Sequence, residues 1–536
     1  MNFTHNGSAR TRDDSATHIL WLFYFILFVA FALRAYSFVG IVGTDDVSIA
    51  DYALRLLDSG PWVPQTHYQA RVGLIYPLAA VYAIFGVGDW QSALIPLAAS
   101  LVGVWLAFLI ARQLAGDKAG LLAALAIAVF PLDVFGATQL MPDLPLGVLL
   151  AAAFYLALRM VDEVRSVGLA LGAGLVWGLA YLVKIEAAFL LVPLLALLIM
   201  NPKKWRDFLM LFSAVAAIVI LESLVYWLAG GSIMQRLVAV QNQGGGRFVK
   251  EYSETQLWVF PKAWFITFYD FAIHYYLLFA GIVWIIIARA KRFYPVVVWV
   301  VVYLVWLQFG GNPFSELYHV KSHLLRYCNM IAVPMAVVIG GLLEHFFREG
   351  RGRVGIGLTG LMVAIGIFFI NFDTLSYERQ VATKRGINYA LSHDLFPLYM
   401  DRTSFALASI YMRNDPRIAL TKSLQRHHFD TQKTELIDVA AIEGYALINK
   451  GFEQYAWNRY RMDKVDVKGE ADELRVIYRV DNPGNPIAYA QARLLHNLSR
   501  LIPVAFLRDK IGATSRDLLE GDDVVIVTPR GGEGSH

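Results

Sequence analysis

Long apolar runs, separated by short polar segments, follow one another through residues 19–371 of the chain. A membrane-spanning helix needs about 20 mostly apolar residues, and by that measure the runs predict about eleven such helices. A further run at 72–87 has a borderline length and contains Pro77 and Gly86. The expected spans are 19–38, 91–111, 119–137, 144–161, 167–183, 186–200, 207–229, 268–288, 294–310, 327–346 and 354–371.

The distribution of basic residues decides whether the run at 72–87 crosses the membrane. Short cytoplasmic loops are enriched in Lys and Arg. If this run does not cross, nearly every basic cluster falls on one face, so we expect a re-entrant or interfacial helix there. The N-terminus is then cytoplasmic and the C-terminus extracytoplasmic. The clusters are Arg10 and Arg12; Arg112 and Lys118; Lys203, Lys204 and Arg206; Arg289, Lys291 and Arg292; and Arg348, Arg351 and Arg353.

The pattern changes after Asn371, where hydropathy falls and charge rises to the end of the chain. Short strand-like runs alternate there with helical ones, which is typical of an α/β domain. We therefore expect a transmembrane domain at 1–371 and a soluble extracytoplasmic α/β domain at 372–536. The expected strands are 397–401, 417–421, 445–451, 473–480 and 523–529, and the expected helices are 404–412 and 486–502.

Composition supports the membrane class and narrows the partners. Of 536 residues, 57% are hydrophobic and 17% are charged, which is more apolar than a soluble protein of this size can usually bury. A net charge of +4 is too small to indicate a nucleic-acid partner. The single cysteine, Cys328, excludes an intrachain disulfide. The run at 19–38 has no convincing signal-peptide cleavage site, and we expect it to be a retained first span.

Two adjacent acids, Asp45 and Asp46, follow this first span in the stretch VGTDDVSIADYALRLLDSGPW. From Val47 the spacing predicts a short amphipathic helix on the membrane surface, ended by Gly60 and Pro61. The acids could simply cap this helix, because negative charge is favourable at a helix N-terminus. Capping needs only one acceptor, however, so a catalytic carboxylate is the alternative interpretation.

Several stretches, in their order along the chain, resemble the GT-C membrane glycosyltransferases. The resemblance covers about residues 19–345 and is strongest to glycosyltransferase family 39 and its bacterial relatives, the protein O-mannosyltransferases and the aminoarabinose transferases of lipid A. It implies a GT-C fold and an enzyme of the bacterial inner membrane that transfers a sugar from a polyprenyl phosphate to an acceptor on the outer face. The stretches are DDVSIADYALRLLDSG, YQARVGLIYPLAAVYAIFGVGDW, GATQLMPDLPLGVLL, GLAYLVKIEAAFLLVPLL and LLRYCNMIAVPMAVVIGGLLE.

The resemblance also implies roles for individual residues. The acid after the first span is the catalytic site of that family and corresponds to Asp45, with Asp46 beside it; a second outer acid corresponds to Asp143. Arg71 matches only loosely the basic residue of the aminoarabinose enzymes, because QARVG departs from their KPP pattern. This departure argues against an aminoarabinose donor.

The chemistry of a lipid-phosphate donor needs one base and several cations. The phosphate leaves already ionised, so one carboxylate, Asp45, suffices to deprotonate the acceptor hydroxyl, and direct displacement predicts inversion. Asp46 and Asp143 could orient the acceptor, raise the pKa of the base or hold Mg²⁺ or Mn²⁺. The expected phosphate-binding residues are Arg71, Lys184, Lys321, His323 and Arg326, with Glu186 and Tyr327 as supporting residues.

Other interpretations of these residues and of the whole chain stay open. Lys184 and Glu186 could merely end adjacent spans, and Arg326 with Tyr327 could anchor a helix at the interface. The chain could be a transporter or flippase of a lipid-linked sugar, although such proteins usually contain an internal repeat, and this sequence shows none. It could also be a membrane-anchored assembly or binding protein. The acceptor could be a glycan, a lipid or a protein.

Overall fold

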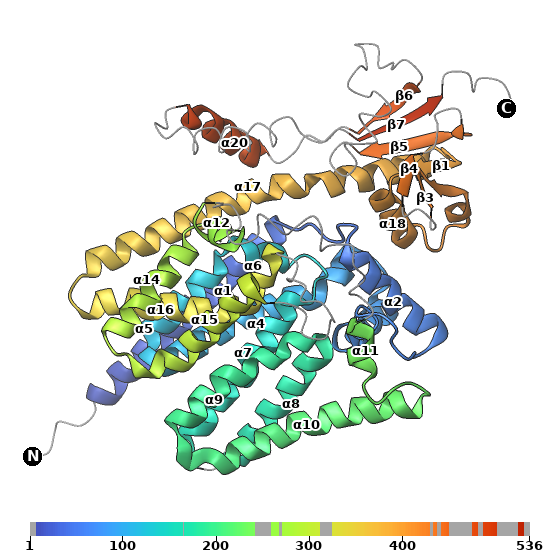
Figure 1. Ribbon diagram of the computed structural model, residues 1–536. Coiled ribbons are helices and arrows are strands. Elements are labelled where there is room, and N and C mark those ends of the chain that lie inside the picture. The colour runs from blue at the N-terminus through green and yellow to red at the C-terminus, as the bar shows by residue number, and fades with distance from the viewer. Residues whose placement is uncertain are drawn as a thin grey trace, which may run out of the picture. The chain divides into compact units, whose positions relative to one another are not determined.

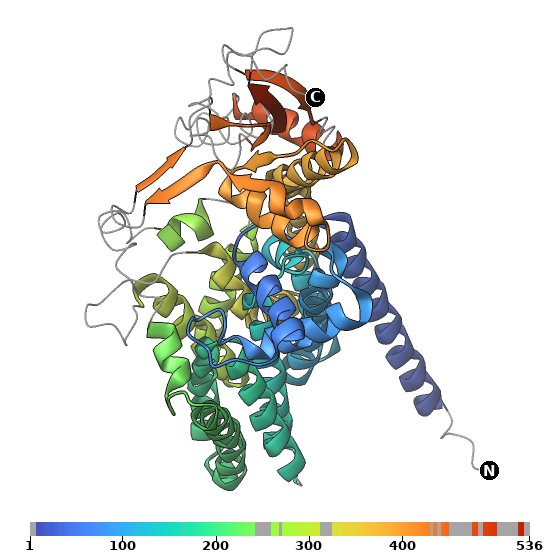
Figure 2. The same ribbon diagram turned by 90° about the vertical axis from the view of Figure 1, so that its right-hand side faces the viewer.

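The protein is described from a computed structural model, and its residues form two compact units (Figures 1 and 2). The first unit comprises Met1–Phe38, Tyr52–Ile84 and Ala93–Ile370, and the second comprises Val39–Asp51, Phe85–Ser92 and Asn371–His536. The structure describes residues 7–164, 166–241, 259–266, 271–310, 324–428, 433–436, 441–449, 474–480, 486–500 and 524–529.

The first unit is a bundle of helices, and α1 runs along its periphery (Figure 2). Short 3₁₀ segments at Ile185–Leu190, Pro202–Lys204, Lys291–Phe293 and Leu325–Ile331 precede four of its helices. The bounds are α1 Gly7–Tyr36, α3 Val72–Phe85, α4 Asp89–Ala115, α5 Asp117–Ala128, α6 Pro131–Gly136, α7 Asp143–Asp162, α8 Val167–Val183, α9 Leu191–Met200, α10 Trp205–Leu228, α11 Gln235–Gln241, α12 Val259–Phe265, α14 His274–Ile287, α15 Tyr294–Phe309 and α16 Ala332–Arg348. The helices α2 Asp45–Ser59 and α17 Gly352–Ser392 contribute residues to both units, as do the end of α3 and the start of α4.

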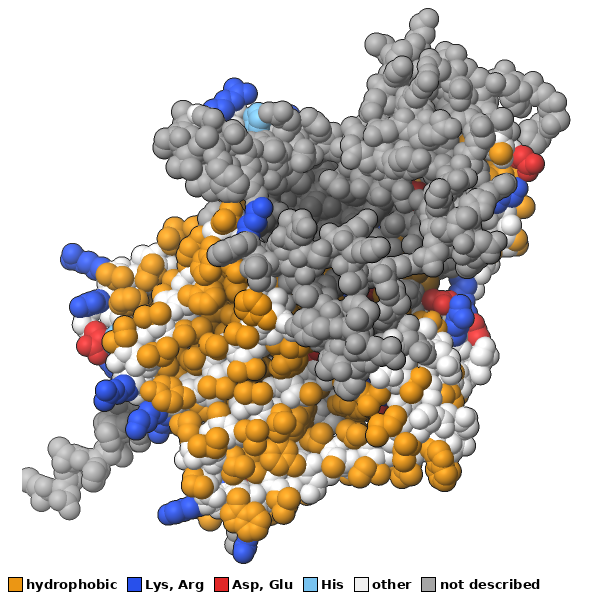
Figure 3. Space-filling view, viewed as in Figure 1, with side chains coloured by type: hydrophobic (Ala, Val, Ile, Leu, Met, Phe, Trp, Pro, Cys, Tyr) orange, Lys and Arg blue, Asp and Glu red, His pale blue; other side chains and the backbone are white. Residues whose placement is uncertain are grey.

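The apolar outer surface of this helical unit identifies an integral membrane protein. Large side chains such as Ile199, Leu228 and Ile287 are more than three-quarters exposed, and hydrophobic atoms cover most of the described face in Figure 3. Lys and Arg side chains appear in that view mainly along its left and lower edges. Among the described residues, seven helices are long and apolar enough to span a membrane: Thr17–Tyr36, Asp89–Ala115, Asp143–Asp162, Pro202–Leu228, Lys291–Phe309, Leu325–Arg348 and Gly352–Asn371.

Four shorter apolar helices, Val72–Phe85, Val167–Val183, Ile185–Met200 and His274–Ile287, accompany these seven. Every predicted span except 119–137 coincides with one of the long or short apolar helices, so the predicted polytopic helical fold is confirmed. The helix expected at 72–87 is α3, which has the same length as α14. Length therefore does not distinguish a crossing from a non-crossing helix here, and the topology stays a prediction.

The prediction of one span at 119–137 is wrong, because two helices occupy that range. α5 ends at Ala128 and α6 begins at Pro131. Proline has no N–H to donate and disfavours helical backbone in the residue before it, so Pro131 prevents α5 from continuing. The break leaves carbonyl groups of α5 without helical partners. His274 Nε2 lies 2.9 Å from one of them, Ala126 O.

Arg34 of α1 satisfies the remaining carbonyls at this break. Its guanidinium donates to Ala128 O at 3.2 Å and Ile127 O at 3.4 Å, and pairs with the Asp133 carboxylate at 2.5 Å. Its Nε donates to Ser100 Oγ at 2.6 Å. Arg34, Ser100 and Asp133 are completely or almost completely buried. A broken helix at membrane depth is tolerated because these side chains replace the missing backbone partners.

The second unit contains a mixed five-stranded sheet in the order β2-β1-β5-β7-β6. β1 runs parallel to β2 and β5, whereas β7 runs antiparallel to β5 and β6. The α/β character expected of the C-terminal region is confirmed. The strands are β1 Leu398–Met400, β2 Thr421–Ser423, β5 Tyr445–Asn449, β6 Leu474–Arg479 and β7 Val524–Pro529, and the helices α18 Arg402–Tyr411 and α20 Pro486–Ser499 also belong to this unit.

Two local features of this unit differ from expectation. The run 417–421 was expected to be a strand, but it lies mostly in a 3₁₀ turn, Pro416–Leu420, and the strand β2 begins only at Thr421. Pro416 is preset for a turn, and the Asp415 side chain accepts from Arg417 N to cap it. An unexpected antiparallel pair, β3 Gln425–His428 and β4 Lys433–Leu436, follows.

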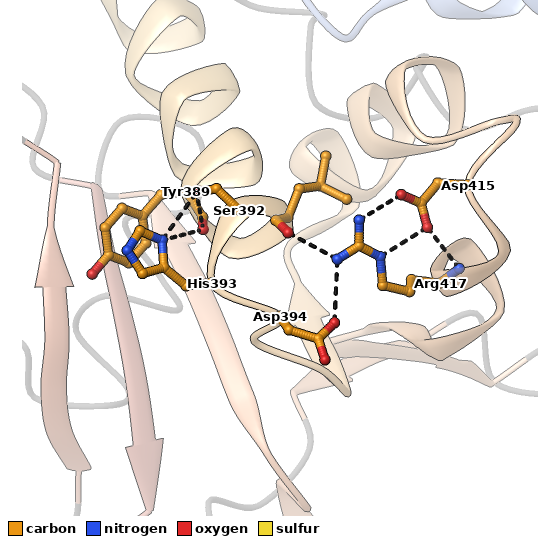
Figure 4. Close-up of polar contacts among 7 residues, drawn as sticks. Tyr389, Ser392, His393, Asp394, Asp415 and Arg417 are labelled. Atoms are coloured by element: carbon orange, nitrogen blue, oxygen red, sulfur yellow. Dashed lines mark hydrogen bonds and ion pairs between the residues drawn. The ribbon is translucent and has the colours of Figure 1, made fainter.

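An arginine ends the long helix α17 (Figure 4). Arg417 Nη1 donates to Leu391 O at 2.8 Å and pairs with Asp394 Oδ1 at 3.2 Å. Its Nη2 pairs with Asp415 at 2.7 Å, and the hydrogen bonds from Arg417 lower the pKa of Asp415 to about 2. Cations are favourable at a helix C-terminus, so Arg417 both caps α17 and fixes the turn that leads to β2.

Candidate functional site

The acidic pair lies at the start of α2, as predicted, but its two members have different surroundings. Asp46 is fully buried, and its carboxylate accepts hydrogen bonds from the backbone N–H groups of Val42, Thr44 and Val47. Burial raises the pKa of Asp46, and these hydrogen bonds oppose that shift. Asp45 is only partly buried.

These contacts change the expectation for Asp46. Both of its oxygens are taken by backbone donors of the loop 42–47, so it does not offer them to an acceptor or a cation. The capping interpretation therefore describes Asp46, which fixes the turn into α2. Asp45 is left as the member of the pair whose position suits contact with a substrate.

A second cluster of charges forms around Asp143 in the first unit. Asp143 is the first residue of α7 and is 1% exposed. Lys184 Nζ lies 2.9 Å from its Oδ1 and 3.4 Å from Glu186 Oε1. Arg326 Nε lies 3.4 Å from Asp143 Oδ2. The structure thus brings together four residues that the sequence placed on the site separately.

Tyr327 forms one wall of this charge cluster. Lys184 Nζ lies 4.4 Å from the centre of its ring, and Arg326 Cζ lies 5.8 Å away. Tyr303 donates its hydroxyl proton to Tyr327 O at 3.0 Å, which fixes the backbone of this segment. Cations over an aromatic face are stabilised by the ring quadrupole, so the ring holds one ammonium and one guanidinium group close together.

Two close backbone contacts explain why distant segments meet here. A Cβ on Gly73 would lie 2.7 Å from Val183 N, so only glycine lets the start of α3 contact the end of α8. A Cβ on Gly147 would lie 2.8 Å from Asn329 O, so α7 packs directly on the 3₁₀ segment after Arg326. These contacts place Arg71 near Lys184, and Asp143 near Arg326.

Arg71 is a nearly buried cation in this region that makes few contacts with its described neighbours. It is 7% exposed, its guanidinium lies 4.8 Å from the Tyr68 ring centre, and Nη1 has no hydrogen-bond partner among the described residues. A buried donor without a partner costs about 1–3 kcal/mol, so such a group indicates a ligand. An anion is the ligand that suits a guanidinium.

The Lys184 ammonium stays charged because of its two acidic neighbours. Lys184 lies between α8 and the 3₁₀ segment Ile185–Leu190, outside both apolar helices. Burial lowers its pKa, but Asp143 and Glu186 outweigh this effect, so that its pKa lies above the ordinary lysine value; Arg71 acts in the opposite direction. Three cations against two carboxylates leave the cluster of Arg71, Lys184, Arg326, Asp143 and Glu186 with an excess positive charge, which favours a phosphate.

Two of the predicted phosphate ligands, Lys321 and His323, lie outside the described residues. In the described part of the chain, no three His, Cys, Asp or Glu side chains are placed to hold a metal ion together. Asp46 and Asp143 are engaged with N–H groups and cations, so the described residues do not fit Mg²⁺ or Mn²⁺, and no step below uses a metal.

Comparison with known proteins agrees with this architecture. The family model for dolichyl-phosphate-mannose-protein mannosyltransferase matches residues 73–227. The oligosaccharyltransferase of Archaeoglobus fulgidus, solved with a tethered acceptor peptide, superimposes with a TM-score of 0.50 at 13% identity, over 67% of this chain and 57% of that one. The chain has a GT-C fold.

Two further GT-C structures are similar to the chain over most of their length. ArnT from Cupriavidus metallidurans in the apo state has 19% identity and a TM-score of 0.45, covering 76% of this chain and 77% of that one. The same protein bound to undecaprenyl phosphate has 18% identity and a TM-score of 0.43, covering 76% of each chain. No curated protein sequence matches. The matched family range contains Asp143, Lys184 and Glu186, but not Asp45, Arg71 or Arg326.

Besides Arg34 and Asp133, sequence reasoning missed a second buried ion pair of the first unit. Arg236 pairs with Glu222 at 2.5 Å, Tyr226 donates to the same carboxylate at 3.0 Å, and the guanidinium lies 4.7 Å from the Tyr181 ring centre. Glu222 interrupts an apolar helix, which is a signal that an ionisable group has a specific partner. The partner itself lies outside that helix and could not be read from the pattern.

Proposed function

We propose that the chain transfers a sugar from a polyprenyl-phosphate carrier to an acceptor hydroxyl on the extracytoplasmic face of a bacterial inner membrane. The observation that carries the proposal is the cation cluster of Arg71, Lys184 and Arg326, in which Arg71 Nη1 has no hydrogen-bond partner among the described residues. The family description that matches the chain, a dolichyl-phosphate-mannose transferase, supports a lipid-phosphate donor. The cluster lies at the ends of apolar helices of an integral membrane protein, which supports a lipid-borne substrate.

The role proposed for the cations follows from the charge that develops in the reaction. As the bond between the anomeric carbon and the phosphate oxygen breaks, its electron pair stays on the phosphate, whose charge becomes more negative. Fixed cations therefore bind the transition state more tightly than the donor, which is the condition for catalysis. Asp143 and Glu186 hold Lys184 and Arg326 in place and thereby reduce the reorganisation that this step requires.

The role proposed for Asp45 is that of general base. The acceptor oxygen forms the new bond to the anomeric carbon while its proton moves to the Asp45 carboxylate. The leaving phosphate needs no proton, so a second carboxylic acid of the kind used by glycoside hydrolases is not required. A single displacement inverts the anomeric configuration. The acceptor is a hydroxyl of a glycan, a lipid or a protein.

Acceptor-dependent turnover tests this function and separates it from transport. Purified protein supplied with a polyprenyl-phosphate sugar should release the lipid phosphate only when an acceptor is present. Asp45→Asn should reduce the rate about 10²- to 10⁴-fold, the usual contribution of a general base. Asp58→Asn, at the exposed far end of the same helix, is the matched control and should retain the rate. Normal turnover by Asp45→Asn would refute the assignment of the base, and transport without release would favour a flippase.

A further inference from the structure

A partly buried ion pair in the second unit contacts the loop that leads to Asp45. Lys384 of α17 places Nζ 2.8 Å from Oδ1 of Asp89, the first residue of α4. Their side chains are only 11% and 24% exposed. Tyr411, the last residue of α18, donates to the same Asp89 oxygen at 2.5 Å. Lys384 and Tyr411, from two helices far from α4 in the sequence, thus converge on one carboxylate.

The backbone of residues 39–41 completes this group. Lys384 Nζ donates to Val39 O at 3.0 Å, and Ile41 N donates to Asp89 Oδ1 at 2.8 Å. Gly40 lies between them with φ +78°, and a Cβ at this position would fall 2.2 Å from Asp89 Oδ1. Only glycine combines this backbone conformation with this approach. The two members of the ion pair therefore bind the loop backbone in complementary ways. Lys384 donates to a carbonyl, and Asp89 accepts from an N–H group.

The next part of the loop packs on the same unit. A Cβ on Gly43, whose φ is +87°, would lie 2.6 Å from Thr403 Cγ2 of α18. Asp46 then accepts from Val42 and Thr44 and closes the turn into α2. The loop 39–44 belongs to no helix or strand, so these contacts, and no backbone ladder, determine its conformation.

We propose that Asp89, Lys384 and Tyr411 are positioning residues, which hold the loop 39–44 and thereby set the position of Asp45. The inference rests on the proposed role of Asp45. A base must lie within hydrogen-bond reach of the acceptor proton, and misplacement by about 1 Å can cost about 10²-fold in rate. The proposal gives the C-terminal region 372–536 a role in the reaction, because Lys384 and Tyr411 belong to it. This role does not require the region to bind a ligand.

Loop mobility tests the proposal without reference to catalysis. A Cys328→Ala background removes the single native cysteine, and Thr44→Cys in the exposed part of the loop accepts a spin label. Lys384→Met and Asp89→Asn should each mobilise the label, and Tyr411→Phe, which removes one hydrogen bond, should do so to a smaller extent. Arg385→Met, the exposed neighbour on α17, is the matched control and should leave the label immobile.

Kinetics and pH provide the second measurement. Lys384→Met should lower kcat about 10- to 100-fold with little change in the donor KM, since the loop does not belong to the phosphate cluster. Burial lowers the pKa of Lys384, against the raising effects of Asp89 and Asp46, so the pair should break at a lower pH than an exposed lysine would allow. Tyr411 is the third titratable group near Lys384, and its hydroxyl donates a hydrogen bond to Asp89. Lys384→Arg should rescue the rate and keep the loop ordered to higher pH.

The outcomes separate this proposal from the proposed function. An immobile label at position 44 in both Lys384→Met and Asp89→Asn would overturn the positioning role, whatever the activity. A mobile label with an unchanged kcat would also overturn it. If instead Asp45→Asn turns over normally while the label responds as expected, the assignment of the base fails and the contact of the pair with the loop stands.

Discussion

The adjacent carboxylates Asp45 and Asp46 have different roles because they differ in burial and in their hydrogen-bond donors. Asp46 is enclosed and accepts three backbone N–H bonds, whereas its neighbour Asp45 is partly exposed. The cations of the first unit also differ: Lys184 is paired with two carboxylates, while Arg71 Nη1 has no hydrogen-bond partner among the described residues. A buried cation that is paired with carboxylates supports a site, and a guanidinium nitrogen without such a pairing can bind a ligand.

Replacing Arg71 tests which cation meets the phosphate. Arg71→Met should weaken binding of polyprenyl phosphate about 10- to 100-fold, because a hydrogen bond to a charged group contributes about 1.5–3 kcal/mol. Arg55→Met, on the exposed polar face of α2, is the matched control and should bind normally. Calorimetric titration of both variants with the lipid phosphate measures the difference. Equal affinities for Arg71→Met and the unchanged protein would remove Arg71 from the donor site.

The sequence predicted the members of the charge cluster better than their pairing. Lys184 stood out because ionisable residues are rare in apolar stretches, whereas Asp143 followed from the family resemblance and Arg326 from its expected place on the outer face. These residues meet because Gly73 and Gly147 allow close backbone contacts between segments. The sequence does not show which backbone a glycine in a helix contacts. Asp89 and Lys384 were missed for a related reason: each sits in an ordinary polar segment, and only the fold brings them together.

At the scale of elements, the break between α5 and α6 shows how a side chain can replace a helical turn. Hydropathy indicated a single span over 119–137, since both helices are apolar. Pro131 was visible in the sequence, but prolines also occur inside α3 and α4 without ending those helices. The break at Pro131 differs because buried Arg34 donates hydrogen bonds to the freed carbonyls. The hydrophobic pattern could not show that Arg34, on α1, would lie beside them.

Removing that arginine should destabilise the helical unit. Arg34→Leu leaves the Asp133 carboxylate buried without its counter-ion, which costs about 3–5 kcal/mol, and it also frees two carbonyls. The double variant Arg34→Leu/Asp133→Leu should cost less than the single one, because no charge is left unpaired. Thermal unfolding of the purified protein in detergent measures both. A single variant as stable as the unchanged protein would show that the pair does not stabilise the break.

At the scale of the whole molecule, the account depends on which face of the membrane each loop occupies. The expected arrangement follows from the basic clusters and from a helix α3 that does not cross; one additional crossing would invert every later loop. Hydropathy and composition sufficed to predict the polytopic fold and the α/β character of the C-terminal region. They could not predict that Val39–Asp51 and Phe85–Ser92 group with that region, because this depends on tertiary contacts.

Sided labelling of the acidic loop shows on which face of the membrane Asp45 lies. In the Cys328→Ala background, Thr44→Cys lies one residue before Asp45 and is exposed. Glu349→Cys, between α16 and α17, is the control for the opposite face. We predict that a membrane-impermeant maleimide labels position 44 in intact cells and position 349 only in inverted membrane vesicles. Labelling of position 44 only in inverted vesicles would place Asp45 in the cytoplasm and contradict transfer on the outer face.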